Sequence, residues 1–277
     1  MVTPAQRHDL VTHLTSKGLS QRSACRWSGL SRSTARHRLQ QPARDAQAIT
    51  AMQPVMMQHP RFGYRRVAGL AQLSFKRAWR LWKQQGFAVQ AGRVRRPRAI
   101  RRDERLPQAT HRNQVWTYDI LYDRLADGRV FKTLSILDEF TRECLAIHVA
   151  PSIRARDVLT VLHRTMQHHG RPQFLRSDNG SEFTAIAVQQ WLHDQRVGPS
   201  FITPGHPWQN GFIESFHGKF RDECLNREWF TTGHEATIVI EQWRKAYNTQ
   251  RPHSALGYQT PAQVAALSTQ QPGATLV

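Results

Sequence analysis

Cysteines and long apolar runs are scarce in this 277-residue sequence. Its three cysteines, Cys25, Cys144 and Cys224, lie far apart and form no Cys-x-x-Cys pair, which excludes a disulfide framework and a cysteine zinc site. No apolar run approaches the roughly 20 residues of a membrane-spanning helix, and the first residues lack the apolar core of a secretory signal. We therefore expect one to three domains in a reducing cytoplasm, with no membrane partner.

Acidic residues are scarce in the first part of the chain. Residues 1–108 hold 22 basic and four acidic side chains, whereas residues 109–277 hold 17 and 16. The formal net charge of +19 is thus concentrated at one end, which indicates a polyphosphate partner such as nucleic acid. An anionic membrane surface is the alternative. It would favour a lysine-rich amphipathic helix, but this segment is rich in arginine and carries turn signals.

Residues 1–42 predict a helix–turn–helix unit that binds DNA. The segment PAQRHDLVTHLTSKG begins with proline and ends at glycine, and SQRSACRWSG and SRSTARHRLQ each open on serine, a good helix cap. The last helix would enter the major groove with Arg32, Arg36 and Arg38. The alternative is a small helical hairpin with a solvated basic face. His8 and His13 lack the cysteine pair that a zinc finger needs.

Residues 43–91 predict a second basic helical unit. Arg65 and Arg66, within HPRFGYRR, are its candidate DNA contacts. The aromatic residues of SFKRAWRLWKQQGF recur at helical spacing, which favours a role in the core over stacking on bases.

Residues 92–108 predict an arginine-rich linker. Seven arginines, Arg95 and Arg96 among them, lie within GRVRRPRAIRRDER. We expect this arm to follow DNA phosphates, and the alternative is a solvated tail.

Residues 109–266 predict an α/β domain, followed by a disordered tail at residues 267–277. QVWTYDILY, VFKTLSILDEF and ECLAIHVA have the composition of three strands with hairpin-length connections. Helix-like and strand-like segments then alternate, which is typical of a mixed sheet covered by helices.

Three carboxylates stand out in this domain by their location. Asp119 lies inside the first apolar strand, where a charge is costly without a partner. Asp178 follows a later strand, and Glu214 lies among apolar residues in NGFIESFHGKF. Taken alone, the Asp-Asn-Gly sequence at 178–180 indicates only a turn. If the two strands are neighbours, however, the three side chains could converge.

Converging carboxylates repel one another, and divalent metal relieves that repulsion. Oxygen ligands without cysteine favour Mg²⁺ or Mn²⁺ over Zn²⁺. Two such ions could activate a hydroxyl and stabilise the leaving oxygen of a phosphoryl displacement.

The segments WTYDI, RSDNGSEF and PWQNGFIESFHGKFRDE resemble the three signatures of the DDE integrase/transposase superfamily. The 35 residues between Asp178 and Glu214, and the basic Arg221 seven residues later, resemble the IS-three family of bacterial insertion-sequence transposases. HPRFGYRR and YNTQRPHSALGYQTPAQ are similar to further segments of its downstream-frame (orfB-type) product. The resemblance covers nearly the whole chain and implies a ribonuclease-H-like integrase core with a five-stranded mixed sheet.

The resemblance also implies roles for individual residues. Asp119 would bridge two Mg²⁺ ions, and Asp178 and Glu214 would each complete the coordination of one. Arg221, and more weakly Lys219, would hold a DNA phosphate; solvated helix residues are the alternative. Asn210 and Gly211 would position the glutamate.

The activity implied is nicking at a transposon end and joining of the freed 3′-hydroxyl to target DNA, by an oligomer acting in the bacterial cytoplasm. The family's active enzyme is usually a fusion with an upstream-frame product, so fusion or association with that product is expected. Two alternatives remain, a DNA-binding regulator with an inactive core and a nuclease that cuts without joining.

Overall fold

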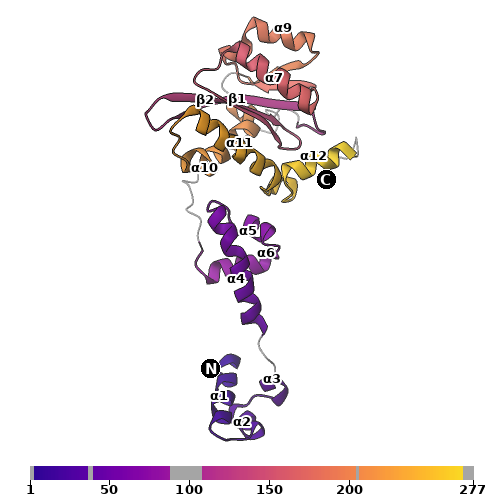
Figure 1. The fold of residues 1–277 in the computed structure, drawn as a ribbon. Coiled ribbons are helices and arrows are strands. Elements are labelled where there is room, and N and C mark those ends of the chain that lie inside the picture. The colour runs from indigo at the N-terminus through magenta and orange to yellow at the C-terminus, as the bar shows by residue number, and fades with distance from the viewer. Residues whose placement is uncertain (1–2, 37–39, 88–107, 204–205, 271–277) are drawn as a thin grey trace. The chain divides into compact units, whose positions relative to one another are not determined.

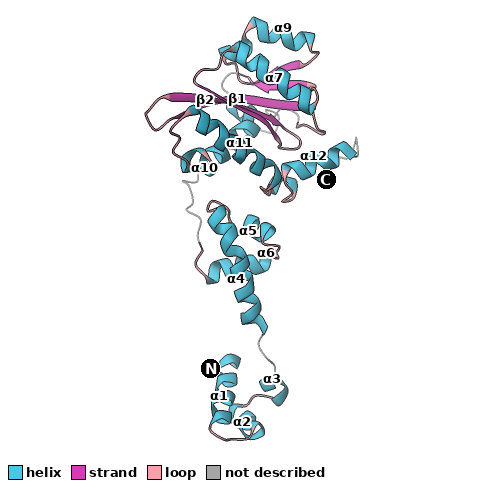
Figure 2. Cartoon of the chain, viewed as in Figure 1, coloured by secondary structure: helices cyan, strands magenta, loops and turns pink. Residues whose placement is uncertain are grey.

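The computed structural model describes residues 3–36, 40–87, 108–203 and 206–270. Contacts divide the chain after Pro54 into two compact units, each described here by itself. Strands occur only in the second unit within the described ranges (Figure 2). None of the helices in those ranges is both long enough and apolar enough to cross a membrane. The division into five segments made from the sequence stays a prediction.

The first unit contains α1 (Pro4–Ser16), α2 (Gln21–Ser28) and α3 (Arg32–Arg36), followed by α4 (Gln40–Gln58), which contains Pro54. The Oγ1 of Thr3 caps α1, and the Oγ of Ser20 caps α2. Gly29 ends α2 with a φ of 65°, a left-handed conformation that suits glycine. Val11, Ala24 and Cys25 form the buried centre of the three short helices.

The second unit takes in the last residues of α4, which are followed by α5 (Tyr64–Leu70) and α6 (Phe75–Gln84). These two helices pack on each other. The aromatic spacing in α6 predicted that Phe75 and Trp79 are buried in the core, but both side chains are exposed. Phe75 and Trp79 are 40% and 46% exposed, whereas the small Ala78 and Leu81 are fully buried. The face that packs is therefore the one carrying the smaller side chains.

The rest of the second unit is built on a five-stranded sheet (Figure 1). Its strands are β1 (Val115–Arg124), β2 (Val130–Asp138), β3 (Cys144–Ala150), β4 (Phe174–Ser177) and β5 (Gly198–Phe201). They lie in the order β3-β2-β1-β4-β5. β1, β2 and β3 form an antiparallel meander, and β4 and β5 add in parallel to β1. The predicted mixed five-stranded α/β fold is confirmed.

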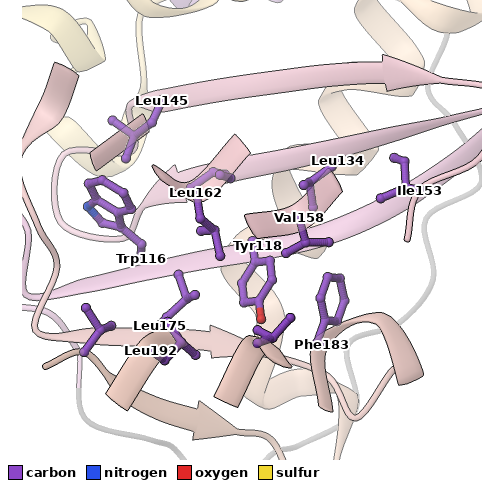
Figure 3. Packing of buried hydrophobic residues seen from close by; sticks show 13 residues of the cluster. Trp116, Tyr118, Leu134, Leu145, Ile153, Val158, Leu162, Leu175, Phe183 and Leu192 are labelled. Carbon is purple, nitrogen blue, oxygen red and sulfur yellow. The ribbon is translucent and has the colours of Figure 1, made fainter. Parts of the chain in front are cut away.

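Helices cover both faces of this sheet (Figure 1). On one face lie α7 (Ala155–His169), the short α8 (Ser181–Thr184) and α9 (Ile186–Asp194). Their side chains pack on Trp116 and Tyr118 of β1 in the cluster shown in Figure 3. On the other face lie α10 (Gly211–Glu223) and α11 (Gly233–Thr249), which enclose a second core around Phe216 and Phe220. Within the described residues, Cys144 and Cys224 of this second core are free thiols, like Cys25 of the first unit.

The chain after α11 is fastened back onto the domain before α12 (Pro261–Gln270). The Nε and Nη2 of Arg251 donate to the two carboxylate oxygens of Glu223 at 2.7 and 2.5 Å. The ring of His253 packs edge-on against Tyr247, with 4.8 Å between the ring centroids. Residues 251–253 after the helix are therefore a buried structural element rather than a loose connection.

Burial of His253 predicts a loss of stability in acid. Burial, followed by the charge of Arg251, lowers the pKa of its imidazole to about 2. Below pH 6.5 the unfolded chain therefore takes up a proton that the folded chain refuses, and the free energy of unfolding falls as pH falls. Between pH 7 and pH 5 this group contributes about 2 kcal/mol to that fall. His253→Gln should flatten the pH dependence of urea unfolding by this amount, whereas His193→Gln, on an exposed side chain, should not.

Candidate active site

The alternation of side chains along β1 determines where Asp119 points. Trp116 and Tyr118 enter the core under α7, so Thr117 and Asp119 point to the opposite face, where α10 contacts β1. Asp119 is half-buried, with 25% of its side chain exposed, and its Oδ1 accepts a hydrogen bond from the backbone N–H of Ile120 at 2.7 Å. The carboxylate is thus fixed on a central strand beneath α10.

Asp178 comes next to Asp119 through the strand register. β1 and β4 are parallel, with Thr117 paired to Arg176. Two residues further along the chain are Asp119 on β1 and Asp178, which directly follows the last residue of β4. The two strands are therefore neighbours, which was the condition for Asp119 and Asp178 to lie close together.

The turn after β4 holds the Asp178 carboxylate. Its Oδ1 accepts a hydrogen bond from the N–H of Gly180 at 3.0 Å, and the Asn179 side chain donates to the carbonyl of Ile202 at 2.9 Å. Gly180 has a φ of −58°, so the turn does not need a left-handed residue. A Cβ at this position would lie 3.1 Å from the Asp178 Oδ1 and 3.3 Å from the Phe183 ring, so glycine serves here to admit both.

Glu214 lies in the first turn of α10, and a buried hydrogen bond ties the start of that helix to β1. The Oγ1 of Thr117 donates to the Oδ1 of Asn210 at 2.6 Å. Ile213 and Phe216 anchor the helix in the second core, and Glu214 itself is exposed. Asn210 thus fixes the start of the helix that carries Glu214. Its hydrogen-bond partner, Thr117, lies two residues before Asp119 on β1.

The Asp119 carboxyl is difficult to ionise in the folded protein. Burial, opposed by the hydrogen bond from Ile120 and reinforced by the charges of Asp178 and Glu214, raises the pKa of its carboxyl to about 7. Burial also raises the pKa of Glu214. At pH 7 this end of the sheet therefore favours binding of positive charge.

His217 is a neighbour of Asp119 that sequence reasoning missed. Its Nδ1 lies 3.5 Å from the Asp119 Oδ2. Burial, and then the charge of Arg221, lowers the pKa of the imidazole to about 4, so the ring is neutral at pH 7 and supplies no cation. The available signal was helical spacing, since His217 follows Glu214 by three residues and shares its face.

Asp178 and Glu214 lie near enough to Asp119 for their charges to raise the pKa of its carboxyl, but the three side chains do not form a metal cage. Across the described residues, no three His, Cys, Asp or Glu side chains are gathered closely enough to hold an ion. The donor set nevertheless fits a hard divalent cation, because it consists of carboxylate oxygens and Asp119 is strained by uncompensated charge. The grouping by topology supports the metal prediction, and coordination itself stays a prediction.

The other acids near the site have structural partners. Asp138 accepts hydrogen bonds from the backbone N–H groups of Asn113 and Thr141, at 2.8 and 2.7 Å. Glu139 is buried and accepts from the Nη1 of Arg176 with both oxygens at 2.9 Å. Glu182 lies 3.6 Å from the ammonium of Lys132.

The predicted DNA contacts that the structure describes come from α3, α5 and α10. Arg221 is exposed on α10, and Lys219 on the same helix is half-buried. Arg32 and Arg36 are exposed on α3, Arg65 is exposed on α5, and Arg66 beside it is half-buried. Arg38, Arg95 and Arg96 lie outside the described residues. Their contacts with DNA stay predictions.

Known proteins share this arrangement of segments. Two family models, each described as an integrase core domain, match residues 109–207 and 195–261. The insertion element IS407 uncharacterized 31.7 kDa protein of Burkholderia multivorans is 42% identical over 255 residues, which cover 90% of this chain and 91% of that protein. The chain belongs to the insertion-sequence transposase family of the DDE superfamily. The resemblance drawn from the signatures is therefore confirmed.

Other relatives of this insertion-sequence transposase family member agree. The insertion element IS476 uncharacterized 39.2 kDa protein of Xanthomonas euvesicatoria is 40% identical, with 90% of this chain and 73% of that protein covered. The transposase for insertion sequence element IS904 of Lactococcus lactis is 31% identical over 56% of this chain and 62% of that protein. Among solved structures, a simian T-cell lymphotropic virus intasome matches with 14% identity and a TM-score of 0.48, over 74% of this chain and 70% of that one.

Proposed function

We propose that this protein is a transposase that cuts DNA at insertion-sequence ends and joins the cut strand to target DNA, with two Mg²⁺ or Mn²⁺ ions as cofactors. The observation that carries the proposal is the half-buried Asp119, whose pKa is raised to about 7 by burial and by the charges of Asp178 and Glu214. A half-buried carboxylate whose charge is disfavoured by two neighbouring acids is suited to binding divalent metal.

In this proposal each side chain has a limited task. Asp119, Asp178 and Glu214 would hold the metal. When bound, the metal pair would activate an attacking hydroxyl and stabilise the leaving oxygen of the phosphoryl displacement. The backbone N–H of Ile120 donates to the Asp119 carboxylate and holds it, and the Nδ1 of His217 lies 3.5 Å from its Oδ2. Arg221, exposed one turn beyond His217 on α10, would bind a phosphate of the DNA strand.

The partners proposed are double-stranded DNA, both the element's ends and the target, and further copies of this chain. The concentration of arginine in residues 1–108 supports a phosphate-rich partner. We place the activity in the bacterial cytoplasm, where such DNA is available. Association with the upstream-frame product stays a prediction.

Strand-transfer assays with end-labelled DNA and Mg²⁺ test the proposal. A labelled end joined to target DNA supports a transposase. Cleavage without joining would instead favour the nuclease, and DNA binding without either reaction would favour the regulator.

Magnesium is expected to stabilise the folded protein through the carboxylates. With a dissociation constant near 1 mM, 10 mM Mg²⁺ would add about 1.4 kcal/mol to the free energy of unfolding and raise the melting temperature by about 3 to 5 °C. Asp119→Asn should abolish most of this rise when both proteins are compared at equal ionic strength. An equal rise in both proteins would argue against metal at Asp119.

DNA binding by the full chain is expected to be steeply dependent on salt. If six phosphates are contacted, the affinity falls by about a thousandfold between 50 and 200 mM salt. Fluorescence anisotropy with a labelled duplex measures this slope. A change of less than about tenfold would contradict binding dominated by phosphate contacts.

A further inference from the structure

A cavity of about 430 Å³ lies beside α10, on a different face of the helix from Glu214. Lys219 lines it from α10, Arg176 from β4, and Arg142 from the turn between β2 and β3. Arg251 and His253 line it from the segment after α11. Arg66 lines it from α5. Five cationic side chains from five separate parts of the chain thus meet in one cavity. Among the described residues that line it, none is acidic.

Three of these arginines and the neutral His253 retain buried nitrogen atoms without a hydrogen-bond partner among the described residues. Within the described residues, the Nη1 of Arg142, the Nε of Arg176, the Nη1 of Arg251 and the Nε2 of His253 are all buried without a partner. Buried donors of charged groups are costly to leave unsatisfied, so native proteins normally provide an acceptor for them. A group of such donors around one cavity therefore indicates a missing acceptor.

The carboxylates that pair with these arginines are not among the residues that line the cavity. Glu139 accepts only from the Nη1 of Arg176, and Glu223 accepts from the Nε and Nη2 of Arg251. The five cations that line the cavity, set against these two carboxylates, leave an excess of three formal positive charges. The effect is visible at Lys219, where burial, and then the charge of Arg251, lowers the pKa of the ammonium to about 8.

We infer that this cavity binds one phosphate group. A phosphate offers several strong acceptor oxygens, which match donors arriving from arginines on different elements. The guanidinium of Arg142 stacks on the Phe212 ring with 3.9 Å from its Cζ to the ring centroid, so its free Nη1 is held in place before any ligand binds. The ammonium of Lys219 is also fixed, since it donates to the carbonyl and the Oγ of Ser215 at 2.8 and 2.6 Å.

The phosphate could belong to a DNA strand or to a free phosphate compound, and both offer the same oxygens. The site itself is separate from the carboxylates and does not depend on metal. Its assignment to a DNA strand rests on the proposed function. Both sources predict binding of inorganic phosphate, but only a DNA strand predicts an effect on the salt dependence of DNA binding. The two measurements below therefore distinguish failure of the site from failure of its assignment to DNA.

The first measurement is calorimetric titration of the full-length protein with inorganic phosphate, without divalent metal and at constant ionic strength. Lys219→Gln removes one cation while leaving the buried ion pairs of Arg176 and Arg251 intact, and should weaken phosphate binding by about tenfold or more. The matched control is Lys245→Gln, an exposed residue of α11 with the same charge change, which should bind as the wild type does.

Arg142→Asn provides a second variant in case Lys219→Gln does not fold. Arg142 has a φ of 62°, a conformation that asparagine tolerates, and the change removes a different donor of the same cavity. It should weaken phosphate binding to a similar extent. No phosphate binding by the wild type, or equal loss in the Lys245→Gln control, would overturn the site.

The second measurement identifies the source of the phosphate. If a DNA strand occupies the cavity, Lys219→Gln reduces the slope of log affinity for duplex DNA against log salt by about 0.9, the value for one lost contact. If the slope is unchanged although inorganic phosphate binding is lost, the assignment to DNA is overturned and the site is one for a free phosphate compound.

Discussion

Asp119→Asn is expected to abolish DNA cleavage and strand joining while leaving DNA affinity within about twofold of wild type. Loss of a ligand that both metal ions share should remove at least 4 kcal/mol of transition-state stabilisation, a decrease in rate of about a thousandfold. End-labelled DNA in the presence of Mg²⁺ measures both reactions. Asp123→Asn, the same change four residues along β1, is the matched control and should retain activity.

The same substitution should stabilise the protein in the absence of metal. The folded pKa of Asp119, about 7, lies above its unfolded value, so its ionisation opposes folding progressively as pH rises from 4 to 7 and by a constant amount above 7. The shift corresponds to about 4 kcal/mol at most. Because asparagine still buries a polar amide, we expect a gain of about 2 kcal/mol at pH 8, or about 4 to 8 °C in melting temperature.

Loss of activity together with increased stability would separate a functional charge from a structural one. If Asp119→Asn were less stable than wild type at pH 8, the carboxylate would be part of the packing. If the variant cut DNA at the wild-type rate, Asp119 would have no place in the site. At pH 5, where the wild-type carboxyl is largely protonated, the difference in stability should shrink.

The second large effect is expected at the buried ion pair between Arg176 and Glu139. Arg176→Met leaves the Glu139 carboxylate without the guanidinium that contacts both of its oxygens. Removing one partner of a buried pair typically costs about 3 to 5 kcal/mol, so the melting temperature should fall by about 10 °C. Arg129→Met, at an exposed pair with Asp127, should change the free energy of unfolding by less than about 0.5 kcal/mol.

The pH dependence of this loss follows from the state of Glu139. Burial already raises its pKa to about 7 with Arg176 present, and removal of that positive charge raises it further. Above pH 4.5 the unfolded chain therefore ionises Glu139 while the folded variant keeps it protonated, so stability falls as pH rises. Urea unfolding should show a larger deficit at pH 8 than at pH 5.5. A deficit independent of pH would mean that packing of the Arg176 stem, rather than its charge, is responsible.

The fold could be predicted from the sequence because its signals are local. The β1 segment alternates between two faces, and this period alone places Trp116 and Tyr118 opposite Thr117 and Asp119. The sequence analysis could only say that the carboxylates would converge if β1 and β4 were neighbours, because no local pattern specifies which strands pair. The register of Thr117 with Arg176 fulfils that condition.

The remaining features of the site depend on side-chain packing that spacing does not encode. His217 approaches Asp119 because Phe216 and Phe220 fix the rotation of α10 in the second core. In α6 the aromatic spacing indicated a buried face, but the packed face is that of Ala78. The distances among the three carboxylates depend on their rotamers, and like charges disfavour the rotamers that bring them together. The sequence could therefore predict that the three belong to one site but not how they would coordinate a metal.

The three buried thiols have a practical consequence. Cys25 lies in the first unit, and Cys144 and Cys224 lie in the second core. A thiol reagent can reach each sulfur only when the surrounding helices separate. The rate of modification at each cysteine, followed by mass spectrometry of the digested chain, thus measures how fast its own unit opens. It needs no introduced label and leaves every surface arginine untouched.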